Sequence, residues 1–246
     1  MNRALILTGG IGHPFEDAAP ALAGVFDEIG LRSEIDFDLE RGIARLGSER
    51  FDLVVVYALR WRMDTGEKYA PHRAQWAFSL SDASRATLRE FVAAGGALLA
   101  LHTAIICFDD WAEWKDMIGG RWVWGTSAHP PRGALRAALT DARHAITTRL
   151  PDFVLDNDEV YSGLDLAPDI TPLLVARADT APMREGEPGI HPVLWTHRFG
   201  KARVVCDLLG HDRAALEHPV HRQILQRSAQ WLLGENFALA KEAANV

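Results

Sequence analysis

The chain has 246 residues, of which 48% are hydrophobic and 24% are charged, and its formal net charge is −7. This length is enough for a full hydrophobic core, and the acidic balance argues against nucleic acid as a partner, because nucleic-acid binding leaves a basic footprint. No run of about 18 apolar residues is present, so we expect no membrane span. The sequence predicts one α/β domain over residues 1–234 and a C-terminal tail over residues 235–246.

Two features favour a cytoplasmic location. The sequence enters an apolar run at residues 4–7, without the pattern of a signal peptide. Cys107 and Cys206 are the only two cysteines, which is too few for a disulfide framework and indicates a reducing compartment.

Strands and helices alternate in the first half of the chain. The first three predicted strands are residues 3–8, 31–37 and 51–57, of which the second is partly polar and so expected nearer an edge of the sheet. Periodic apolar residues predict a helix over residues 18–29 and another over residues 81–94, which Asp82 would cap. An apolar run then follows Gly95 and Gly96 and ends at His102. This alternation is typical of a doubly wound, mostly parallel sheet.

The regular pattern stops between residues 58 and 80. A stretch of this length without secondary structure is often a lid or a binding loop. It leaves the carboxyl end of the strand at residues 51–57, so it could overhang a site there. A surface insertion that packs on itself is the alternative.

The second half of the chain is richer in strands. A short helix over residues 109–118 is stopped by Gly119 and Gly120, and Phe199-Gly200-Lys201 predicts a hairpin turn. A final helix starts near Pro219 and ends at Gly234. The predicted strands between these helices are residues 121–124, 133–139, 153–161, 171–178, 193–198 and 202–207.

Three histidines follow predicted strands: His13, His102 and His211. The carboxyl ends of parallel strands meet at one edge of a sheet, so these imidazoles could converge on one cleft. Imidazole serves as an acid, a base or a metal ligand near neutral pH. For each histidine alone, a structural or solvent-facing role is the alternative.

Carboxylates and aromatic rings supply further candidates. Glu159 and Asp212 could fix an imidazole tautomer or share its proton, although a solvated strand end is the alternative for the acidic run at residues 156–159. Tyr161 and Trp195 could present aromatic faces to a sugar, with core packing as the alternative. The residues considered for substrate binding are His13, His129, Tyr161, Trp195 and Thr103.

Other site chemistries find little support. The glycines at residues 9–12 and 119–120 match neither a dinucleotide nor a P-loop fingerprint, so a nicotinamide cofactor or ATP is not expected. His102 stands where some α/β enzymes expose a nucleophilic Ser or Cys. Cys107 lies five residues further on, and an amidase or hydrolase that uses this thiol is a weaker hypothesis.

Short motifs in order along nearly the whole chain resemble the ThuA-like (trehalose-utilisation) family. They are Gly12-His13-Pro14-Phe15-Glu16, Gly95 to His102, Asp110-Trp111, His129-Pro130, Asp158-Glu159-Val160-Tyr161, Phe199 to Val204, Leu209-Gly210-His211-Asp212 and His218-Pro219. The resemblance implies a class I glutamine amidotransferase-like fold, which is a flavodoxin-like sheet with antiparallel strands added in the C-terminal half. It also implies a role in carbohydrate metabolism, in the use of trehalose and related disaccharides, often beside 3-keto-sugar chemistry. Thiol-dependent glutamine hydrolysis is not expected, because His102 occupies the nucleophile position.

We therefore expect action on a disaccharide, glycoside or keto-sugar derivative. His102, Glu159, His211 and Asp212 would carry acid–base or metal-assisted chemistry. No cofactor is fixed by the sequence, but His13, His102 and His211 could bind a divalent ion such as Zn²⁺. The expected partner is a small carbohydrate-like ligand, and a homo-oligomer is compatible with the sequence. The alternative is a non-catalytic module that binds a sugar or a protein partner on the same scaffold.

Overall fold

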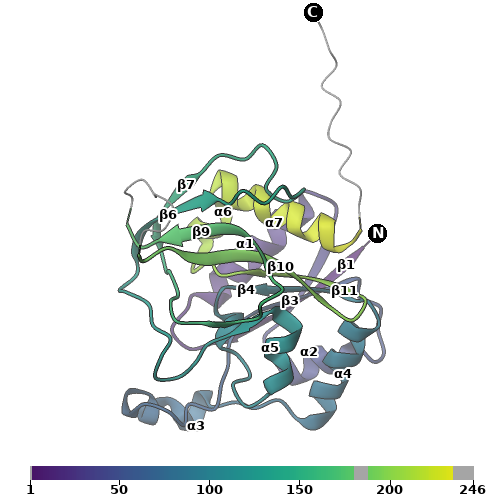
Figure 1. Ribbon diagram of the computed structural model, residues 1–246. Helices are drawn as coiled ribbons and strands as arrows, with labels where there is room; N and C mark the ends of the chain where they lie inside the picture. The colour runs from purple at the N-terminus through teal and green to yellow at the C-terminus, as the bar shows by residue number, and fades with distance from the viewer. Residues whose placement is uncertain (1, 180–187, 235–246) are drawn as a thin grey trace, which may run out of the picture.

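A nine-stranded sheet forms the centre of the computed structural model, which describes residues 2–179 and 188–234 (Figure 1). Its strand order is β2-β1-β3-β4-β11-β10-β9-β6-β7. The first five strands in this order are mutually parallel: β2 (Arg32–Asp36), β1 (Arg3–Gly10), β3 (Leu53–Leu59), β4 (Ala97–Leu101) and β11 (Ala202–Asp207). The antiparallel extension comprises β10 (His191–Phe199), β9 (Thr171–Arg177), β6 (Gly133–Leu139) and β7 (Phe153–Asp158).

Helices cover both faces of the sheet. In Figure 1, α1 (Phe15–Asp27), α6 (Arg213–Glu217) and α7 (Pro219–Leu232) lie above it, and α2 (Leu39–Arg45), α4 (Asp82–Ala93) and α5 (Ala112–Ile118) lie below it. All residues of β3 and β4 are buried, as expected for parallel strands packed on both sides. The predicted fold, a mostly parallel flavodoxin-like sheet with added antiparallel strands, is confirmed. None of the described helices has the length and apolar character needed to cross a bilayer.

Two local predictions were wrong. The cap of α4 is Ser81 rather than Asp82, because the Ser81 side chain accepts a hydrogen bond from the backbone N–H of Ser84 and Asp82 is already helical. The strand expected at residues 121–124 is only the two-residue β5 (Gly120–Arg121), which pairs with β8 (Asp165–Leu166). The chain leaves this ladder to turn at Gly125, which has a φ of +85°.

Several element ends also differ from the sequence-based expectation. The strand expected at residues 153–161 ends at Asp158, whose carboxylate turns inward and accepts the N–H of Glu159. Residues 58–80 are not wholly irregular, since they contain the short helices η1 (Glu67–His72) and α3 (Arg73–Trp76). The predicted tail at residues 235–246 lies outside the described residues.

Candidate functional site

His102 begins the site at the carboxyl end of the central strand β4. It follows Leu101 directly and starts the short helix η2 (His102–Ile106) with a φ of +52°, a conformation that non-glycine residues adopt at a cost of about 1–3 kcal/mol. Its Nδ1–H donates to the carbonyl oxygen of Leu208 over 2.8 Å. This sharp turn between a central strand and a short helix is the kind of place at which α/β hydrolases expose a nucleophile, and here an imidazole occupies it.

Four side chains from four loops meet at this point. His13 follows β1, His211 follows β11, and Glu159 follows β7; together with His102 they place one ligand atom each within 4.8 Å of one another. His102 is fully buried, and His211 and Glu159 are 4% and 8% exposed. We call these four residues the histidine–glutamate cluster. The three histidines converge as expected, because each of them follows a parallel strand.

The hydrogen bonds of two imidazoles fix their tautomers. A carbonyl oxygen can only accept, so Nδ1 of His102 carries the proton that faces Leu208, and Nδ1 of His13 carries the one that faces Ile11 at 3.4 Å. In the neutral rings both Nε2 atoms therefore present lone pairs. These two nitrogens lie 3.1 Å apart, so a cation between them would be favoured over two facing lone pairs.

Burial sets the charge of the cluster. It lowers the pKa of His13 to about 3 and that of His102 to about 4, so both rings are neutral near pH 7. Burial alone would raise the pKa of Glu159, but the nearby imidazoles of His211 and His102 outweigh it and lower that pKa. The cluster thus combines the neutral imidazoles of His13 and His102 with the ionised carboxylate of Glu159, the forms in which these groups bind metal ions.

Asp158 joins two of the loops that carry the cluster. Its carboxylate accepts hydrogen bonds from the backbone N–H groups of Glu159 at 2.8 Å, Gly210 at 2.7 Å and His211 at 3.3 Å. The hydroxyl of Tyr57 donates to the carbonyl oxygen of Gly210 at 2.6 Å. Asp158 and Tyr57 therefore fix the backbone from which Glu159 and His211 project.

Three of the predicted substrate-binding residues lie beside the cluster. The Tyr161 hydroxyl donates to Glu159 Oε2 over 3.0 Å, and its ring stacks on His102 with centroids 5.5 Å apart. His129 Nδ1 is 3.8 Å from Glu159 Oε1, and this side chain is 39% exposed. Thr103 donates to the carbonyl oxygen of Ala58 and lines a small cavity of about 80 Å³ against the cluster.

Two predicted site residues lie elsewhere. Asp212 is adjacent to His211 in sequence, but it caps α6 by accepting the N–H of Ala215 at 3.0 Å. Trp195 is fully buried on β10, and its indole N–H donates to the carbonyl oxygen of Ile118 at 2.8 Å. Both side chains are occupied by structural roles.

Cys107 does not have the environment of a nucleophile. Its thiol is buried and donates to the carbonyl oxygen of Ala58 at 3.1 Å. Burial raises its pKa to about 12, so little thiolate is present near neutral pH.

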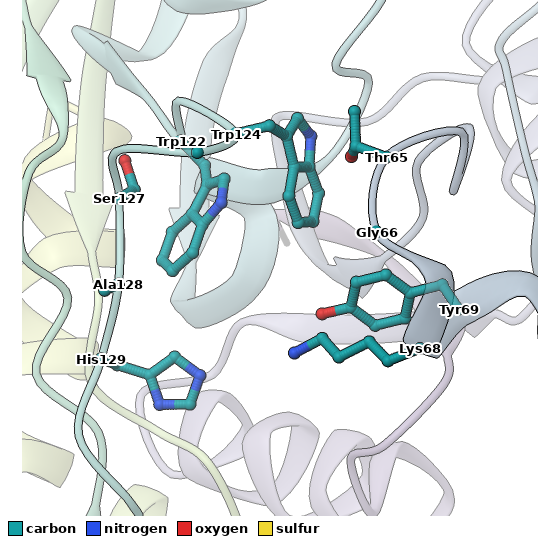
Figure 2. Close-up of a pocket in the computed structure, with 10 residues that line it drawn as sticks. Thr65, Gly66, Lys68, Tyr69, Trp122, Trp124, Ser127, Ala128 and His129 are labelled. Atoms are coloured by element: carbon teal, nitrogen blue, oxygen red, sulfur yellow. The ribbon is translucent and has the colours of Figure 1, made fainter.

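A larger cavity of about 570 Å³ opens next to the cluster (Figure 2). Tyr69, Trp122, Trp124 and His129 line both this cavity and the small one at the cluster. The sequence-based interpretation missed Trp122 and Trp124 because residues 121–124 were expected to be a strand. The two-residue spacing of Trp122 and Trp124, which puts both on one side of an extended chain, was the available signal.

The model of the ThuA trehalose-utilisation family matches residues 3–232. The chain belongs to this family. Comparison with curated protein sequences gives no match. Membership confirms the resemblance carried by the motifs and supports a role related to trehalose utilisation.

Solved structures share the ThuA fold at low sequence identity. A ThuA-like protein from Parabacteroides merdae ATCC 43184 superposes with a TM-score of 0.71 at 19% identity, covering 95% of this chain and 91% of that one. One from Bacteroides uniformis ATCC 8492 gives 0.65 at 16%, with coverages of 94% and 91%. A β-galactosidase from Rahnella sp. R3 gives 0.55 at 14%, covering 94% of this chain but 31% of the enzyme. These likenesses concern the fold alone.

Proposed function

We propose that this ThuA-family chain is an enzyme of carbohydrate metabolism whose histidine–glutamate cluster binds a divalent ion such as Zn²⁺. Its substrate would be a disaccharide, a glycoside or a keto-sugar derivative. The observation that carries the proposal is the pair of facing Nε2 lone pairs of His13 and His102, 3.1 Å apart and beside an ionised carboxylate.

The donor set suits zinc. Imidazole nitrogens and a carboxylate oxygen are typical ligands of catalytic Zn²⁺ sites. The outer partners also fit, because the carbonyl oxygen of Leu208 fixes the tautomer of His102 and the Tyr161 hydroxyl holds one oxygen of Glu159. When bound, the ion would supply a Lewis acid that polarises an oxygen of the substrate.

The chain's own residues would handle the proton. His129 is the half-exposed imidazole at the cluster, and it lines the larger cavity as well. It is therefore placed to give a proton to, or take one from, a substrate oxygen held between the cluster and that cavity. Tyr161 would keep Glu159 oriented and, with Thr103, would close the buried side of the small cavity.

Metal analysis of the purified protein tests the proposal. We expect about one Zn²⁺ or similar ion per chain in the wild type and loss of that ion in His102→Ala and Glu159→Gln, as in sites built from few ligands. His72→Ala, at an exposed histidine outside the cluster, is the matched control. Turnover of disaccharides and 3-keto-disaccharides should stop on chelation and return with metal. If the purified protein contains no metal and chelators do not change its turnover, the proposed metal site is wrong. If a sugar binds but no sugar is turned over, the protein is better described as a binding module.

A further inference from the structure

We propose that the cavity of about 570 Å³ beside the cluster is a subsite for the second sugar ring of the substrate. The bond that links the two rings would lie next to His129. This inference rests on the proposed function of the cluster. It narrows the substrate from carbohydrate derivatives in general to molecules with two linked pyranose rings.

The walls of the cavity suit the flat face of a pyranose. Trp122 and Trp124 come from one segment, and Lys68 and Tyr69 face them from the other side of the cavity (Figure 2). The ring of Trp124 lies 6.0 Å from that of Trp122 and 5.9 Å from that of Tyr69. Such amphipathic rings offer apolar surface together with a polar edge. The volume also lies in the range of about 300–1,000 Å³ that is usual for small-molecule sites.

Unpaired indole donors indicate that the ligand carries hydroxyl groups. Within the described residues, Nε1 of Trp61, Trp122 and Trp124 is buried and has no hydrogen-bond acceptor. Away from this cavity, the buried indoles of Trp114 and Trp195 donate to backbone carbonyl oxygens at 2.9 Å and 2.8 Å. Trp122 and Trp124 line both cavities, and Trp61 lines the small one. A buried donor without a partner costs about 1–3 kcal/mol, so three of them at these adjoining cavities point to an acceptor supplied from outside. Sugar hydroxyls are such acceptors, and a purely aromatic group is not.

Tyr69 packs against two of the three tryptophans that carry these donors. Its ring packs against Trp61 and Trp124, with centroids 5.0 Å and 5.9 Å away. Because the three Nε1 atoms are buried in this structure, a hydroxyl reaches them only after side chains around the cavity rearrange. Tyr69 belongs to η1, in the stretch that the sequence marked as a lid or a binding loop.

The cavity and the cluster are adjacent parts of one site. The small cavity of about 80 Å³ is lined by Glu159 and Tyr161 and also by Tyr69 and Trp124. His129 lines both cavities. A two-ring substrate would therefore place one ring at the cluster and the other among the tryptophans, with the linking oxygen beside His129.

Calorimetric titration with trehalose, maltose and cellobiose, compared with glucose, tests the subsite. We expect the wild type to bind at least one disaccharide about tenfold more tightly than glucose, and Trp124→Ala and Tyr69→Ala to lose that preference because they weaken disaccharide binding more than glucose binding. Trp231→Ala is the matched control, because Trp231 lies on α7 against His144 and Arg203. Tyr69→Ala keeps the test valid if Trp124→Ala does not fold, since Tyr69 lies on a surface segment.

Each failure has a separate signature. A wild type without preference for any disaccharide, or variants that keep it, would overturn the subsite, as would tighter binding of 4-nitrophenyl glucoside than of every disaccharide. The metal content of Trp124→Ala should equal that of the wild type. A wild type that binds no metal would count against the proposed function alone. A disaccharide preference in a metal-free protein would leave the subsite standing.

Discussion

The Nε2 atoms of His13 and His102 lie 3.1 Å apart, and burial holds the pKa of both imidazoles far below neutral pH. Two neutral rings whose protons are on Nδ1 repel each other in this arrangement. Glu159 Oε2 is 3.6 Å from His102 Nε2 and 3.9 Å from His13 Nε2, close enough for one cation to contact all three atoms. The folded chain thus carries an electrostatic cost that a bound divalent ion would relieve.

Zinc should therefore stabilise the fold. An ion that binds only the native state at about 100 times its Kd adds about 2.7 kcal/mol to the free energy of unfolding. We expect a corresponding rise in Tm when Zn²⁺ is added to chelator-treated wild type, and no rise in His13→Ala or His102→Ala. Differential scanning calorimetry measures both. An equal rise in the variants would mean that zinc binds elsewhere.

Tyr161→Phe should weaken metal binding without removing it. The substitution keeps the ring that stacks on His102 but deletes the hydroxyl that donates to Glu159 Oε2 over 3.0 Å. Loss of such an outer-shell partner usually lowers metal affinity about 10- to 100-fold. Competition with a chromogenic chelator gives the Kd, and equal affinities in variant and wild type would show that Tyr161 does not orient Glu159.

The meeting of His13, His102 and His211 was predictable, because all three follow parallel strands and the carboxyl ends of such strands share one edge. Glu159 could be named as a candidate, but its position beside the three histidines could not be derived from the sequence. It follows β7, the outermost strand of the antiparallel extension, and returns to the centre through Asp158 and the backbone at Gly210. Such long-range contacts leave no local pattern in the sequence.

Adjacency in sequence was a poor guide for other residues. Asp212 follows His211 directly, yet a helix begins there and its carboxylate is used as the cap. Trp195 and Trp124 looked alike as isolated tryptophans, and only the packing decides that one indole pairs with a carbonyl oxygen while the other borders a cavity. Buried hydrogen-bond partners, which separate these cases, are not visible before the fold is known.

Gly10, at the end of β1, and Gly12, in the loop that carries His13, should differ sharply in their tolerance of substitution. Gly10 has a φ of +138°, and a Cβ there would overlap the backbone of Leu59. Gly12 has a φ of +78° and open space around it, so Gly12→Ala should cost only about 1–2 kcal/mol of backbone strain. We expect Gly10→Ala to lower the free energy of unfolding clearly more than Gly12→Ala in urea titrations. Equal losses would contradict the close approach of the two strands.

Both cysteines should be inert in the native protein. Burial raises the pKa of Cys107 to about 12 and that of Cys206 well above its usual range. Thiolate is the reactive form, so a thiol reagent should label neither residue until the chain is unfolded, when both should react. Rapid labelling of native Cys107 with loss of turnover would revive a thiol mechanism.

The buried pair of His221 and Asp207 should make stability depend on pH. His221 Nε2 lies 3.0 Å from Asp207 Oδ2, and both side chains are fully buried. Burial alone would lower the pKa of His221, but the charge of Asp207 and the hydrogen bond to it outweigh burial and raise that pKa. A pKa higher in the folded than in the unfolded chain stabilises the protein below the unfolded value of about 6.5, and this contribution is lost as pH rises through the folded pKa.

His221→Gln isolates this effect, because an amide can still donate to Asp207 but does not titrate. We expect the wild type to exceed the variant most in free energy of unfolding below the unfolded pKa of about 6.5, with the difference shrinking as pH rises through the folded pKa and the imidazolium loses its proton. Urea titrations at several pH values measure the difference, and the other histidines cancel in it. His221→Phe leaves the Asp207 charge buried and unpaired, so it should cost about 3–5 kcal/mol. A difference between wild type and His221→Gln that stays constant with pH would mean that pairing with Asp207 does not raise the pKa of His221.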